Sequence, residues 1–225
     1  MSNTDSFIDE VSEEVRRDRL YGYLRRYGWV AVVAILVIVG GAAYNEYRKS
    51  QAEAQARELG DATLTAMQET TPAARAAALQ EIAIPEDSEA RAVIRLLEAT
   101  EANAAGDAEA AAAALNDVAN DDDLPAIYRD IARFRALTLE GAVDDADRRM
   151  GLEALAVAGN PLRVLAEEQI ALMDLAQGDT DAARDRFAAL IDDAEASDGL
   201  RNRATQAIVA LGGLPEEDSA GSDSE

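Results

Sequence analysis

Cysteine and histidine are both absent from this chain of 225 residues. Without them the chain forms no disulfide, no thiolate or imidazole metal site, and no Ser-His-Asp or Cys-His nucleophile pair. Lysine is nearly absent, because Lys49 is the only one beside 20 arginines, and the aromatic side chains are three Phe, six Tyr and one Trp. What remains is a helix-rich composition in which 49 residues are alanine.

The charge is strongly negative, with 44 acidic and 21 basic residues and a net charge of −23. Residues 50–225 carry the whole imbalance, with 14 Arg against 37 acidic residues. A phosphate lattice repels so acidic a domain, and we therefore expect no nucleic-acid partner. The acidic clusters at 121–123 and 144–147 lack the spacing of a calcium loop and suit helix starts. We expect no metal, no cofactor, no small-molecule substrate and no enzymatic activity.

An uncharged run near the N-terminus predicts a membrane helix. Residues 29–43 read WVAVVAILVIVGGAA, and with their flanks the uncharged run covers residues 27–44. At 1.5 Å per residue this is about 27 Å of helix, enough to cross a hydrocarbon core. Aromatic residues at both ends fit two membrane interfaces. A cleaved signal peptide is the alternative, but the segment that precedes the run is too long and too acidic to be the first part of one.

The arginine and lysine counts predict the orientation of this helix. Residues 14–28 carry five Lys or Arg and residues 45–59 carry three, which favours the N-terminus inside. The prediction is a single-pass membrane protein with residues 1–26 cytoplasmic and the acidic domain outside, in the periplasm if the source is a Gram-negative bacterium. Within residues 1–26, Phe7, Val11 and Val15 recur at helical spacing. This amphipathic segment either lies on a surface or forms a docking face for a cytoplasmic partner.

Turn signals divide the remaining chain at regular intervals. They are Thr71-Pro72, Gly106-Asp107, Gly141 and Gly178-Asp179, and the spacings between them are 35, 35 and 37, close to the period of tetratricopeptide repeats. We therefore predict an all-α fold: a single transmembrane helix, then a tetratricopeptide-like helical repeat solenoid over residues 45–211. Residues 212–225 are predicted to be a disordered acidic tail.

Apolar stripes at helical spacing predict which residues face the core. They comprise one stripe at Ile127, Ile131 and Phe134, another at Ala183, Phe187, Leu190, Ile191 and Ala194, and two on the helix over 161–177. The first face of that helix carries Leu162, Ala166, Ile170 and Met173, and the second carries Leu165, Leu172 and Leu175. The second face is either buried against the next helix or lines a groove for a partner protein. Leu165, Leu172 and Leu175 are the candidate partner groove.

Several segments resemble the YfgM-like tetratricopeptide proteins. They are RRYGW and GGAAYNEYRK around the apolar run, AAGDAEAAAAAL and YRDIARFRA in the repeats, and the closing GLRNRATQAIVALGG. This family includes the ancillary subunit of the SecYEG translocon in Gram-negative bacteria. The resemblance implies an inner-membrane protein that associates with the Sec translocon and with periplasmic chaperones. The chain departs from the family pattern at Gly141 and Thr71-Pro72, where the Gly-Asp pair is missing.

The sequence thus predicts a non-enzymatic, membrane-anchored periplasmic adaptor that mediates protein-protein interactions during secretion. Two alternatives stay open. One is a membrane-anchored scaffold for envelope assembly or cell division. The other is a regulator that sequesters a soluble cytoplasmic partner through the helix that carries Phe7, Val11 and Val15.

Overall fold

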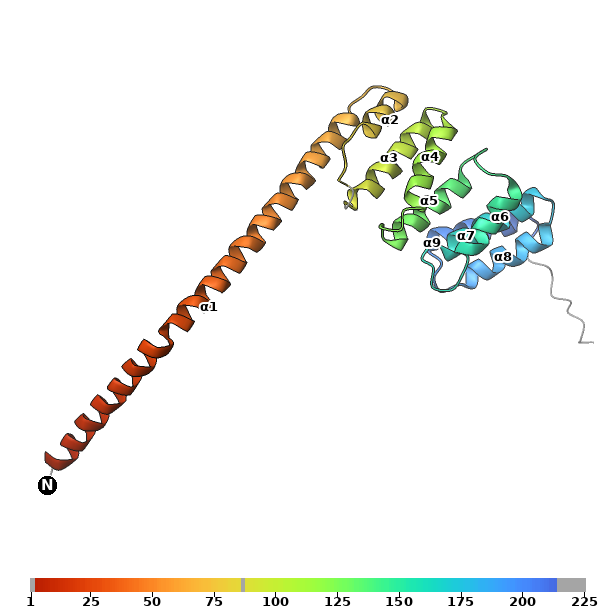
Figure 1. The fold of residues 1–225 in the computed structure, drawn as a ribbon. Helices are drawn as coiled ribbons and strands as arrows, with labels where there is room; N and C mark the ends of the chain where they lie inside the picture. Colours follow the sequence, from red (N-terminus) through yellow and green to blue (C-terminus); the bar gives the residue numbers. More distant parts are fainter. Residues whose placement is uncertain (1–2, 86–87, 214–225) are drawn as a thin grey trace, which may run out of the picture. The chain divides into compact units, whose positions relative to one another are not determined.

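The computed structural model describes the backbone of residues 3–85 and 88–213, and none of these residues lies in a β-strand. The predicted all-α class is confirmed (Figure 1). The helices are α1 (Asn3–Ala66), α2 (Pro72–Gln80), α3 (Ala90–Ala104), α4 (Ala108–Ala119), α5 (Ala126–Thr138), α6 (Asp145–Leu155), α7 (Arg163–Ala176), α8 (Thr180–Asp192) and α9 (Asp198–Ala210). In α1 the side chains are described from Arg25 onward, except those of Tyr27, Gly28 and Ala31.

The chain divides into two compact units, Met1–Glu58 and Leu59–Glu225. The first unit contains α1 alone as far as Glu58, and the large apolar side chains that the structure describes there, among them Trp29, Leu36 and Ile38, are exposed. A single helix offers these side chains no partner within its own unit. The second unit, which we call the helical domain, contains the end of α1 and the helices α2 to α9.

The predicted membrane helix at 27–44 is contradicted by the structure. Among the residues described, no helix combines the length and the apolar character needed to cross a bilayer. The same finding contradicts the prediction of a single-pass inner-membrane protein with a cytoplasmic N-terminus and a periplasmic C-terminal domain.

Consecutive helices pack against each other along the helical domain, from α2 on α3 to α8 on α9 (Figure 1). Two of the connections are tight turns at the predicted Gly-Asp pairs. Gly106 and Gly178 adopt φ angles of 81° and 83°, which lie in the left-handed region open to glycine. The aspartates that follow cap the next helices, because Asp107 accepts from the Ala110 N–H at 3.0 Å and Asp179 accepts from the Ala182 N–H at 3.1 Å.

The sequence numbers of the two turn glycines differ by 178 − 106 = 72, and the helices around them match at the same shift. This shift places α3 on α7 and α4 on α8 with ends that differ by no more than two positions, and it places α5 on α9 with identical bounds. The buried residues match as well. The pairs are Ala92 with Val164, Ala99 with Ala171, Ala111 with Ala183, Leu115 with Phe187, Val118 with Leu190, Leu124 with Ala196, and Ala132 with Ala204.

Helices α2 and α6 match at a shift larger by one, as their N-caps show, because 144 − 71 = 73. These N-caps are Thr71 and Asp144, and Leu79 and Leu152 are both fully buried at the shifted position. The helical domain therefore contains an N-terminal half, α2 to α5, and a C-terminal half, α6 to α9, whose helices match in pairs. We call this pairing, with a shift of 73 for α2 and α6 and of 72 for the other three pairs, the common register of the two halves.

The predicted core stripe on α8 is confirmed at Ala183, Phe187 and Leu190, which are all buried, whereas Ile191 is half-buried and Ala194, beyond the end of α8, is exposed. The stripe predicted on α5 is confirmed only in part, because Phe134 packs against the core cluster that contains Leu152. Ile127 is 40% exposed there, and the buried residues facing α3 and α4 are Ala132 and Ala136. Because alanine has no side chain beyond Cβ, it lets the helix axes approach closely, and the larger residues of α5 lie beside the contact.

Candidate protein-binding sites

The three residues of the predicted groove lie on α7 and differ in exposure. Leu165 and Leu175 are partly buried against the core shared by α7, α8 and α9, whereas Leu172 is 44% exposed. The other face of α7 is also buried, with Ile170 and Met173 in a cluster with residues of α6. Helix α7 thus packs on two sides. Of the three residues of the predicted groove, Leu172 is the exposed one, and a partner could reach it there.

The candidate docking face in the N-terminal segment lies outside the described side chains. The backbone of Phe7, Val11 and Val15 belongs to α1, and their side chains are among those that the structure leaves undescribed. Residues 214–225, most of the predicted tail, also lie outside the described residues.

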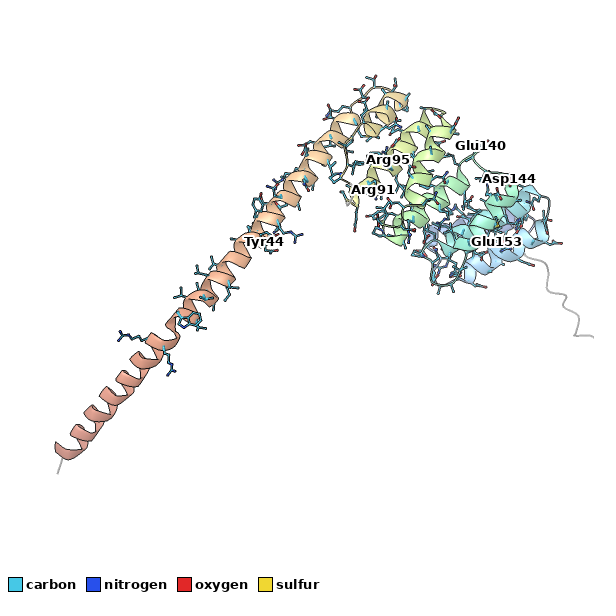
Figure 2. The ribbon with its side chains drawn as sticks, in the orientation of Figure 1. Tyr44, Arg91, Arg95, Glu140, Asp144 and Glu153 are labelled. Atoms are coloured by element: carbon cyan, nitrogen blue, oxygen red, sulfur yellow. The ribbon has the colours of Figure 1, made fainter. Side chains whose placement is uncertain are left out.

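Leu172 lines a cavity of about 330 Å³, which we call the α6–α7 cavity. Its apolar floor comes from Leu152, Leu172 and Met173. Polar and charged residues surround this floor: Thr138, Glu140, Asp145, Arg148, Gln169 and Gln177. Glu140 lies in the connection between α5 and α6 (Figure 2). An apolar floor with a polar rim suits an apolar side chain of a protein segment.

A second cavity of about 300 Å³ lies among α2, α3 and α4, and we call it the α2–α4 cavity. Its lining is mostly alanine, contributed by all three helices and the turn after α3: Ala73, Ala76, Ala77, Ala102, Ala105, Ala110, Ala113 and Ala114. Its charged lining residues are Arg95 on α3 (Figure 2), Glu98, Asp107 and Asp117. The sequence gives no sign of this cavity, because runs of alanine indicate helix propensity and carry no signal for a gap between helices.

Every arginine of the helical domain makes a polar contact inside the fold. Twelve of the 13 pair with a carboxylate. The thirteenth, Arg135, donates to the Leu96 carbonyl at 3.2 Å and to the Thr100 hydroxyl at 2.8 Å. Residues 59–225 hold 35 acidic side chains, so the net charge of the domain is 13 − 35 = −22. Its cations are engaged, and its surplus charge is carboxylate.

The buried acids are paired, and the pKa shifts follow from such pairing. Arg203 donates two 2.7 Å hydrogen bonds to Glu168, and this pairing raises the pKa of Arg203. The pKa of Asp193 is lowered, first by a hydrogen bond from the Glu195 backbone N–H and then by one from Arg163. The pKa of Arg163 is raised in turn by Glu195 and Asp193. The raised arginine pKa values and the lowered pKa of Asp193 both favour the charged forms of these groups.

No group of three or more acidic side chains in the described part of the chain is placed to hold a metal ion. The two cavities present carboxylate oxygens, amides and small apolar surfaces. No protein family model, no curated protein and no solved structure matches the chain.

Proposed function

We propose that the chain is a non-enzymatic adaptor whose helical domain is a tetratricopeptide-like repeat that binds segments of other proteins. The observation that carries this proposal is the common register of the two halves. Their shift of 72 equals two periods of 36, and helix-turn-helix repeats of about 34 residues form stacked scaffolds for protein recognition.

The turn geometry supports the same interpretation. After Gly106 the N–H of Asp107 donates to the Ala102 carbonyl at 2.9 Å, and after Gly178 the N–H of Asp179 donates to the Asp174 carbonyl at 2.9 Å. Each turn thus closes one helix with a six-residue hydrogen bond and opens the next with an aspartate cap. The turn is built twice from the same parts, as a repeat requires.

The charge of the domain selects the kind of partner. With its arginines engaged and a net charge of 13 − 35 = −22, the domain attracts basic or positively patched proteins and repels acidic ones. Association should therefore be fast at low ionic strength and slow as salt is added. Components of the Sec translocon and folding chaperones, which the family resemblance suggests, are the first partners to test.

Site-specific photo-crosslinking in intact cells tests this function. A photoreactive residue replaces Leu172 at the α6–α7 cavity or Gln80 at the α2–α4 cavity, and Val209, an exposed apolar residue of α9, is the matched control. We expect discrete products, identified by mass spectrometry, from at least one cavity position. If both cavity positions give no more product than Val209, the helical domain is not a protein-binding module.

A further inference from the structure

The C-terminal half fills the space between α6, α7 and α8 with an ion-pair network. Asp174 on α7 accepts from Arg149 of α6 at 2.5 Å and from Arg186 of α8 at 2.9 Å. Arg186 also donates to Glu167 at 2.9 Å, and Arg149 donates to Gln177 at 3.4 Å. Two guanidinium groups from different helices thus meet over one buried carboxylate.

The N-terminal half has almost none of these groups at the matching positions. In the common register of the two halves, Arg149 is replaced by Ala76, Asp174 by Ala102, Arg186 by Ala114, Gln177 by Ala105 and Glu167 by Arg95. All five of these N-terminal residues line the α2–α4 cavity. The space that two arginine side chains fill in one half is therefore open in the other.

Two positions in the wall of the open cavity carry carboxylates where the filled half has apolar residues. Glu98 and Asp117 stand where the C-terminal half has Ile170 and Ala189. Glu98 is 7% exposed and pairs with Arg95, while no arginine in the described part of the chain pairs with Asp117. The alanine lining leaves room for an aliphatic stem beside these carboxylates.

We propose that the α2–α4 cavity binds an arginine side chain presented by a segment of a partner protein. This inference rests on the proposed protein-binding function and names its chemistry. The planar guanidinium forms paired hydrogen bonds with a carboxylate, as the Arg203–Glu168 pair of this domain does. A cavity of about 300 Å³ lies at the small end of ligand sites, which fits one long side chain.

Nuclear magnetic resonance titration of the full chain tests the proposal. The probe is the peptide acetyl-Ala-Ala-Leu-Arg-Leu-Ala-Ala-amide, and the matched peptide carries citrulline, which has the shape of arginine without its charge. We expect the arginine peptide to shift the resonances of Ala102, Ala114 and Asp117. The citrulline peptide should bind about tenfold more weakly, because it loses a charge-assisted pair.

Two variants of the chain make the site specific. The triple variant Ala76→Arg, Ala102→Asp and Ala114→Arg transplants the C-terminal network, and it should abolish the shifts while circular dichroism shows the domain folded. Asp117→Asn should weaken binding about tenfold. This variant tests the site independently if the triple variant does not fold. Asp185→Asn, which removes an equal charge from α8, should leave binding unchanged.

Three results would overturn the assignment: equal binding of the two peptides, no effect of Asp117→Asn, or free arginine amide binding as tightly as the peptide. The absence of shifts up to millimolar peptide would also overturn it. If crosslinking from Leu172 still captures a partner in any of these cases, the protein-binding function stands and only this site for it is wrong.

Discussion

The N-terminal and C-terminal halves of the helical domain share one helix register and fill it with different side chains. Where the N-terminal half buries Leu115 and Ala92, the C-terminal half buries Phe187 and Val164. Where the first leaves the alanine-lined α2–α4 cavity, the second places a network centred on Asp174. One backbone arrangement thus accepts two fillings of different volume and polarity.

The two halves agree closely at a loop. Arg91 pairs with Asp121, and at the matching positions of the C-terminal half Arg163 pairs with Asp193. The Asp121 carboxylate accepts from the N–H two residues on at 3.1 Å, and the Asp193 carboxylate does the same at 2.8 Å. Turns, caps and loop ion pairs therefore set the register of the helices in both halves. The side chains between the helices decide whether a half contains a cavity or an ion-pair network.

The largest expected effect concerns the apolar filling. Phe187→Ala should lower the free energy of unfolding by about 3–5 kcal/mol, and Leu115→Ala at the matching position by about 2–4 kcal/mol, because the larger side chain leaves the larger cavity. Urea unfolding followed by circular dichroism measures both. A near-neutral Phe187→Ala would show that the register of α8 is wrong.

The turns and the core of α8 could be predicted from sequence because their signals are local. A Gly-Asp pair specifies a residue with positive φ followed by a helix N-cap, and Phe187 is the largest apolar side chain of α8. On α5, by contrast, Ile131 and Ala132 both continue a helical stripe. Hydrophobicity favoured the isoleucine, and close helix approach selected the alanine.

The candidate sites depend on packing that no single segment encodes. Leu165, Leu172 and Leu175 share an apolar face of α7, yet the placement of α8 and α9 partly buries two of them and leaves the third exposed. The origin of the α2–α4 cavity becomes clear when Ala102 is compared with Asp174, its counterpart in the C-terminal half, because the smaller residue lacks the ion pairs that fill the matching space. In the first unit, an apolar run of the kind that fills a core remains exposed on α1, because a lone helix has nothing to pack against.

A second, smaller effect concerns the polar filling. Asp174→Ala should cost about 2–3 kcal/mol, since it leaves Arg149 and Arg186 without their shared carboxylate, and their partial exposure softens the penalty. Asp145→Ala, which removes an exposed i,i+3 partner, should change the stability by less than about 0.5 kcal/mol. Equal effects of the two substitutions on the free energy of urea unfolding would mean that the network around Asp174 stabilises the domain no more than an exposed ion pair does.

The turns offer a test of equivalence between the halves. Gly106→Ala and Gly178→Ala should each cost about 1–2 kcal/mol, because both residues have positive φ. Gly60→Ala, inside α1 with open space around its Cβ position, should instead stabilise by about 0.5–1 kcal/mol. Thermal unfolding of the three variants separates the two signs. A clear difference between the two turn variants would break the proposed equivalence.

The smallest effect is the acid sensitivity of the Asp193 loop. The Glu195 N–H and Arg163 favour the ionised carboxylate, so the pKa of Asp193 in the folded chain lies below its unfolded value of about 3.9. A carboxyl with a lowered folded pKa adds stability that is fully present above the unfolded pKa and is lost as the pH falls through the folded pKa. Stability measured from pH 6 downward should therefore begin to fall near pH 5 and continue to fall below pH 4.

Asp193→Asn should make this decline shallower, whereas Asp192→Asn, which removes an equal charge from the exposed neighbouring position, should leave it steep. If both substitutions gave the same slope, the decline would belong to the overall charge of the domain, and the loop contacts of Asp193 would have no part in it.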